Sequence, residues 1–78
     1  MNATVENIKE VIVDAEVLGD VSEMKCDVAM SEQGIDSLDL VNVYLLLEEK
    51  FDVKIPDEDL SQVQTIDNIV EYINKKVN

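Results

Sequence analysis

The segment from Leu38 to Phe51 constrains the fold of this chain most strongly, because its apolar residues recur at helical spacing. One apolar stripe consists of Leu40, Val43, Tyr44, Leu47 and Phe51. A second set, which stands beside it, consists of Leu38, Val41 and Leu45. A chain of 78 residues forms a small domain with a thin core, so one of its helices cannot easily bury both sets. We therefore expect a helix whose second set is partly exposed, which is typical of a docking surface.

A first helix is predicted from about Thr4 to Leu18. Its apolar stripe consists of Val5, Ile8, Val11, Ile12, Ala15 and Leu18. Thr4 is a candidate N-cap and Asn2 a competing one, while Gly19 is a natural stop. The β-branched run Val11-Ile12-Val13 weakens helix propensity locally, but the period of the longer window favours a helix.

The segment from Gly19 to Asp36 has no consistent hydrophobic period. A long loop in a compact domain is uncommon and often functional. We expect this loop to lie across the core, pinned by its scattered apolar side chains. These side chains are Val21, Met24, Val28, Met30 and Ile35.

Two further helices are predicted after the segment from Leu38 to Phe51. Asp57 to Gln62 is typical of one short helical turn, with Pro56 at its first position. Thr65 or Gln64 then opens a last helix. Its buried stripe consists of Ile66, Ile69, Val70, Ile73 and Val77. The predicted fold is all-α: a single domain over residues 1–78, built as a small four-helix bundle of three main helices and one short helix, with a long first loop.

The composition excludes several classes of function. The chain has 18 acidic residues and 6 basic ones, a formal net charge of −12, no His and one Cys. Without His there is no Ser-His-Asp triad and no imidazole ligand, and a single Cys26 forms neither an internal disulfide nor a thiolate zinc site. The negative charge disfavours nucleic acid and favours a partner with a basic surface. We expect no membrane span, no signal peptide, no bound metal, a monomer, and a reducing cytoplasmic setting.

Ser37 stands where the strongest helix begins, after Gly34-Ile35-Asp36. A serine at this place is most often a helix cap. Asp36 competes for that role, and with Asp36 as the cap Ser37 would occupy the first helical position with its hydroxyl outward. The positive end of the helix favours an attached phosphate there. Because no His can serve as its base, Ser37 suits a passive acceptor better than a catalytic nucleophile.

Three segments of the chain together resemble the acyl carrier protein family. They are Gly34-Ile35-Asp36-Ser37-Leu38-Asp39-Leu40-Val41, Leu46-Leu47-Glu48-Glu49-Lys50-Phe51 and Ile55-Pro56-Asp57-Glu58-Asp59-Leu60, and the closing Ile69-x-x-Tyr72-Ile73 also fits. The match covers about half of the chain in order and in register. The small size and the acidity of the chain agree with it.

The resemblance implies a carrier and not an enzyme. It implies that Ser37, preceded by Asp36, carries a 4′-phosphopantetheine arm, which a separate phosphopantetheinyl transferase moves from coenzyme A. The thiol of the arm then holds an acyl group as a thioester for enzymes with basic docking surfaces. The positions that would meet such partners are Leu38, Asp39, Val41, Leu45 and Glu48. The positions that could line a shelter for the acyl chain are Leu47, Leu60, Val63 and Ile66, although ordinary core packing explains each of them singly.

The resemblance implies a role in fatty-acid, polyketide or specialised lipid or peptide biosynthesis. Departures from the family pattern favour a dedicated carrier, such as one for a polyketide, a nonribosomal peptide or a specialised lipid, over the housekeeping carrier of fatty-acid synthesis. Asn42 stands where these carriers often have Glu, and Lys50 and Lys54 stand where acids are common. Ser31-Glu32-Gln33 replaces the Glu-Asp-Leu that often precedes the glycine. The alternative function is an acidic helical interaction domain that docks a basic protein through the same exposed set without covalent modification.

Overall fold

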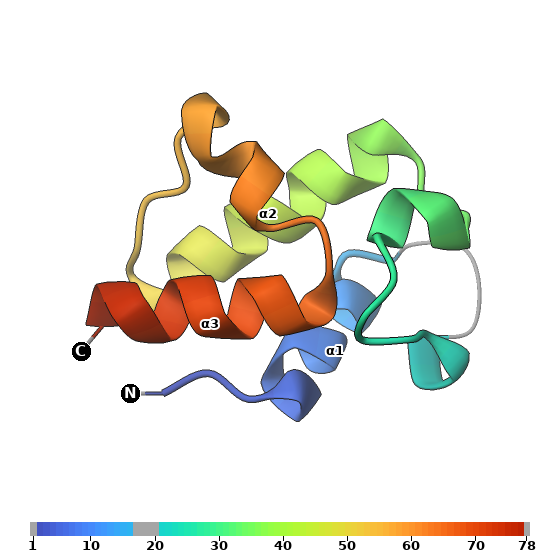
Figure 1. Ribbon diagram of the computed structural model, residues 1–78, viewed down its shortest axis with the longest axis horizontal. Coiled ribbons are helices and arrows are strands. Elements are labelled where there is room, and N and C mark those ends of the chain that lie inside the picture. The colour runs from blue at the N-terminus through green and yellow to red at the C-terminus, as the bar shows by residue number, and fades with distance from the viewer. Residues whose placement is uncertain (1, 17–20, 78) are drawn as a thin grey trace.

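The computed structural model describes residues 2–16 and 21–77, and within them it shows helices and no strands. The three α-helices are α1 (Val5–Asp14), α2 (Ser37–Phe51) and α3 (Ile66–Val77). Three short 3-10 helices lie between them: η1 (Val21–Glu23), η2 (Met30–Gln33) and η3 (Asp57–Gln62). Helix α1 packs against both α2 and α3, whereas η2 contacts α2 and η3 contacts α3 (Figure 1). The all-α prediction is confirmed.

Helix α1 begins as the sequence predicts but ends earlier. Thr4 is its N-cap, and the Thr4 and Asn7 side chains each accept a hydrogen bond of 3.2 Å from the other residue's backbone N–H, which forms a capping box. The helix ends at Asp14 and not at Leu18, because Glu16 adopts a left-handed backbone with φ of 57°. The predicted stop at Gly19 and the last stripe residue, Leu18, lie outside the described residues.

The segment between α1 and α2 is pinned to the core, as predicted, but it contains the two short helices η1 and η2. Met30 is fully buried, Val21 and Ile35 are buried, and Met24 packs against the core while partly exposed. Two backbone hydrogen bonds tie the segment to the start of α3: Met30 N–H donates to the Gln64 carbonyl at 2.9 Å, and Asp67 N–H donates to the Cys26 carbonyl at 3.0 Å. The segment between α1 and α2 is therefore packed against the rest of the fold.

Helix α2 divides its apolar residues as the two-stripe pattern predicts. Val43, Tyr44, Leu47 and Phe51 are buried, and Leu40 is half-buried against the core. Leu38, Val41 and Leu45 keep 73%, 51% and 53% of their surface exposed. The Tyr44 hydroxyl donates to the Val63 carbonyl at 3.0 Å, so α2 also fixes the chain that enters α3.

The last third of the chain differs from the prediction in one detail and decides between two alternatives in another. Pro56 is the N-cap of η3 and not its first helical residue. Thr65, and not Gln64, opens α3, because its hydroxyl accepts a hydrogen bond of 3.0 Å from Asn68 N–H. The α3 stripe buries Ile66, Ile69 and Ile73 as predicted, with Val70 and Val77 partly buried.

Tyr72 lies in a buried and negatively charged environment. It is 8% exposed, and its hydroxyl donates to Asp59 Oδ2 at 2.6 Å. Burial, this hydrogen bond and the nearby negative charges, foremost that of Asp59, raise the pKa of Tyr72 to about 12. The hydroxyl of Tyr72 is therefore bound by a carboxylate and partly withdrawn from water.

A spectrophotometric titration tests this environment. We expect the difference between the titration curves of the wild type and Tyr72→Phe to show a phenol that ionises near pH 12, above the ordinary tyrosine pKa of 10.0. Because the folded state holds this proton more tightly than the unfolded state, the contribution to stability is complete below about pH 10 and is lost as the pH rises towards 12. Circular dichroism at each pH confirms that the protein stays folded. A folded-state midpoint near pH 10 would show that the hydroxyl is solvated.

Candidate functional site

Ser37 is the first residue of α2, and its side chain is exposed. Asp36 is the N-cap by backbone conformation, with φ of −66° and ψ of 151°. Among the described residues its carboxylate accepts no capping hydrogen bond from the helix. Instead Ser37 Oγ donates to Asp36 Oδ1 at 3.4 Å. Of the two interpretations open from the sequence, the structure favours Asp36 at the cap and Ser37 at the first helical position with an outward hydroxyl.

The position of Ser37 depends on the three residues before it. Gly34 ends η2 with φ of 92°, in the left-handed region that glycine adopts without strain. A Cβ on Gly34 would meet no atom within 4 Å, so the constraint is conformational and not steric crowding. Ile35 is only 4% exposed and inserts into the core. This sharp turn and its buried anchor place Asp36 and Ser37 on the surface.

The first turn of α2 favours an anion at Ser37. The first backbone hydrogen bond of the helix runs from Leu40 N–H to the Asp36 carbonyl at 3.0 Å. The N–H groups of residues 37–39 come before it and therefore have no partner inside the helix. A phosphate attached to Ser37 would lie beside these donors and at the positive end of the helix dipole. The residues present therefore fit a phosphate-linked group.

The remaining residues predicted to meet partners lie on or beside one face of α2. Leu38, Val41 and Leu45 are exposed, and Asp39 in the first turn is partly exposed. We call the set formed by Leu38, Asp39, Val41 and Leu45 the α2 face. The structure brings this face to the same end of α2 as Ser37 and continues it along the helix. Its role in docking stays a prediction.

Glu48 has a structural contact that the sequence did not indicate. The side chain is half-buried, and Oε2 accepts a hydrogen bond of 2.7 Å from Ile55 N–H. The carboxylate thus holds the extended segment that follows α2. Leu45 and Glu48 also line one shallow hollow. The other residues that line it are Glu49, Asp52, Val53 and Lys54. Glu48 is therefore near the α2 face, but one of its carboxylate oxygens already accepts the hydrogen bond from Ile55 N–H.

The four candidate lining residues belong to the core. Leu47, Val63 and Ile66 have no exposed surface, and Leu60 of η3 is partly buried against the core. The structure therefore brings together residues from α2, from η3 and from the start of α3. Core packing accounts for this burial, and a role in sheltering an acyl chain stays a prediction.

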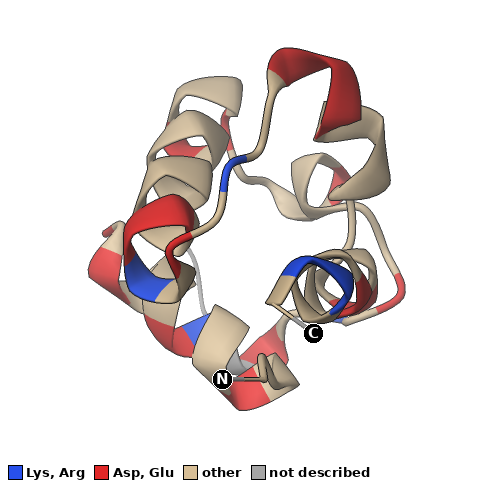
Figure 2. Ribbon diagram, turned by 90° about the vertical axis from the view of Figure 1, so that its left-hand side faces the viewer, with Lys and Arg blue, Asp and Glu red and all other residues tan. Residues whose placement is uncertain are grey.

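Acidic residues outnumber lysines on α1, α2 and η3, whereas α3 carries two of each. Acidic residues occur on α1, α2, η3 and α3, and lysines are few (Figure 2). Within residues 2–16 and 21–77, the one ion pair joins Lys75 to Glu71 at 3.3 Å. Over the same part of the chain, no three acidic or thiol side chains gather closely enough to hold a metal ion. None of the described helices is long and apolar enough to cross a membrane.

Comparisons with known proteins identify the family of this chain. A family model described as a phosphopantetheine attachment site matches residues 6–73. The acyl carrier protein of Solidesulfovibrio magneticus is 41% identical over 73 residues, which cover 91% of each chain. That of Bdellovibrio bacteriovorus is 38% identical over 71 residues, which cover 88% of each chain.

A solved structure shares the fold over nearly the whole chain. The butyryl acyl carrier protein of the actinorhodin polyketide synthase from Streptomyces coelicolor superposes with a TM-score of 0.81 at 28% identity, covering 99% of this chain and 93% of that one. The resemblance stated from the sequence is thus confirmed, and with it the prediction of a carrier that is not an enzyme. The chain belongs to the acyl carrier proteins, which carry acyl groups on a covalently attached 4′-phosphopantetheine.

Proposed function

We propose that Ser37 is the residue that carries the 4′-phosphopantetheine and that a phosphopantetheinyl transferase attaches it from coenzyme A. The observation that supports this most directly is the exposed hydroxyl at the first position of α2, beside free backbone N–H groups. In this step Ser37 Oγ gains a bond to phosphorus and gives up its proton to a base of the transferase. The pyrophosphate bond of coenzyme A breaks, and its second phosphate departs as part of the nucleotide.

We further propose that partner enzymes with basic surfaces dock on the α2 face. An apolar strip with acidic neighbours supports this, because the strip gives up water on binding and the charges steer a basic surface towards it. The neutral Asn42 is exposed, as are Lys50 and Lys54. Compared with the acidic residues that are common at these positions in the family, these three residues make the surface on and beside α2 less negative. This difference supports a carrier dedicated to one pathway. The single Cys26 supports a reducing, cytoplasmic setting.

The attachment site is tested by intact-mass measurement after incubation with coenzyme A and a promiscuous phosphopantetheinyl transferase. We expect the wild type to gain one phosphopantetheine and Ser37→Ala to gain none, with little change in stability because the hydroxyl is exposed. Ser61→Ala is the matched control, since Ser61 is an exposed serine of η3. An increment that persists in Ser37→Ala would contradict the assignment. An unmodified wild type would favour the interaction domain that acts without covalent modification.

The role of Glu48 is tested with two substitutions that separate charge from structure. Glu48→Gln keeps an oxygen acceptor for Ile55 N–H, so we expect it to slow association with a basic transferase at low salt while stability stays nearly unchanged. Glu48→Ala removes the acceptor, and we expect it to cost about 1–3 kcal/mol of unfolding free energy.

Glu49→Gln, at an exposed acid beside Glu48, is the control for the loss of one charge. Association rates come from stopped-flow mixing over a range of salt, and stabilities come from urea unfolding. If Glu48→Gln binds the transferase at the rate of the wild type, Glu48 acts only inside the fold and does not belong with the residues of the α2 face.

A further inference from the structure

The short helix η3 contributes little to the core. None of its six residues, all of them described, is buried. Leu60 is its one apolar side chain that packs, partly exposed, against the core. An element with few buried apolar contacts opens at a lower free energy than the helices around it.

The chain on each side of η3 is fixed to α2. Upstream, Ile55 is 7% exposed and its N–H donates to Glu48 Oε2 at 2.7 Å. Downstream, Val63 is fully buried and its carbonyl accepts from the Tyr44 hydroxyl at 3.0 Å. Residues 56–62 therefore lie between two fixed points, and these points are the natural limits of a unit that opens on its own.

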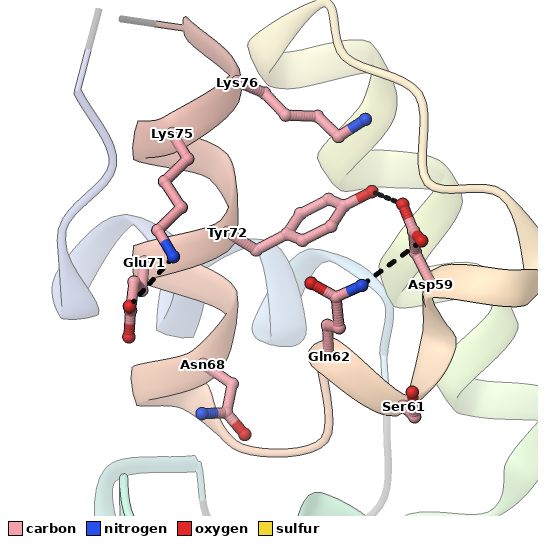
Figure 3. A pocket seen from close by; sticks show the side chains of 8 residues that line it. All are labelled: Asp59, Ser61, Gln62, Asn68, Glu71, Tyr72, Lys75 and Lys76. Atoms are coloured by element: carbon pink, nitrogen blue, oxygen red, sulfur yellow. Dashed lines mark hydrogen bonds and ion pairs between the residues drawn. The ribbon is translucent and has the colours of Figure 1, made fainter.

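Polar contacts around Tyr72 hold this unit against α3. The hydroxyl donates to Asp59 Oδ2 at 2.6 Å and also lies 3.4 Å from the Lys54 carbonyl. Gln62 Nε2 donates to Asp59 Oδ1 at 3.3 Å, and Lys76 Nζ lies 5.1 Å from the centre of the Tyr72 ring. Figure 3 shows the phenol pointing from α3 towards the Asp59 carboxylate. A short hydrogen bond to a charged acceptor, made by a largely buried donor, is among the stronger polar contacts in a protein.

We propose that the hydrogen bond between Tyr72 and Asp59 is a latch that keeps η3 closed over the core, and that its release gives an acyl chain access to Leu47, Val63 and Ile66. The access half of this proposal rests on the proposed function, since it assumes an acyl group on the chain. The latch half concerns the unmodified protein alone. Together they make Asp59 and Tyr72 positioning residues that set how readily the core admits a long acyl chain.

Amide hydrogen exchange of the unmodified protein tests the latch. Two amides report on η3: Asp59 N–H, which donates to Pro56, and Val63 N–H, which donates to Leu60. We expect Tyr72→Phe to speed their exchange roughly tenfold or more, since it removes a hydrogen bond to a charged group. Exchange at Ile8 N–H in α1 and at Ile69 N–H in α3 should change far less.

Two variants at acidic positions of η3 complete this test. Asp59→Asn keeps an oxygen acceptor and should show a smaller effect than Tyr72→Phe. Asp57→Asn, which removes an exposed acid of the same element, should leave the exchange of η3 as in the wild type. A uniform increase at Ile8, Ile69 and the η3 amides, or no increase in η3, would overturn the latch.

The access half is tested on protein modified at Ser37 and loaded with short-chain or long-chain acyl groups. We expect a long chain to change exchange at the Val63 amide more than a short chain does, and to do so more strongly in Tyr72→Phe than in the wild type. Equal exchange for both chain lengths would overturn access through η3. Failure to modify Ser37 would contradict the proposed function, and the result on the unmodified protein would still decide the latch.

Discussion

The burial of Ile35 and Met30 is the constraint on which the site depends. Both side chains come from the irregular segment before α2, and both are enclosed by the core. Once they are buried, the left-handed turn at Gly34 and the anchor at Ile35 leave Asp36 and Ser37 on the surface, and α2 begins with an exposed hydroxyl at Ser37. An acceptor for another enzyme's chemistry needs this rigid presentation more than it needs a catalytic neighbour.

The second feature on which the account depends is the difference in burial between the two faces of α2. Its inner stripe joins the core, whereas Leu38, Val41 and Leu45 face water at a cost in exposed apolar surface. The net charge of −12 opposes self-association through this strip, and it attracts a basic surface from a distance. Ser37, the proposed attachment residue, and the strip share one helix, so a partner docked on the strip would already lie close to the proposed arm.

The hydrophobic period of the sequence was enough to predict the main helices and the exposed strip, because both depend on which side chains recur on one face of a helix. The cap at Thr4 and the buried anchors of the long loop were also predictable. Contacts between a side chain and a distant backbone group were not: Glu48 with Ile55 and Tyr72 with Asp59 depend on the turn after α2, for which no local pattern exists. The early end of α1 was missed because a left-handed Glu16 has no signature in the sequence.

The most direct test of the central claim is the rate at which a phosphopantetheinyl transferase modifies Ile35→Ala, compared with Ile73→Ala. Both substitutions remove a buried isoleucine, but only Ile35 anchors the turn before Ser37. With rates corrected for the folded fraction by circular dichroism, we predict that Ile35→Ala is modified roughly tenfold or more slowly, because a small displacement of a reacting group has a large kinetic effect. Ile73→Ala should match the wild type. Equal rates for the two variants would contradict the claim that the buried anchor positions the hydroxyl.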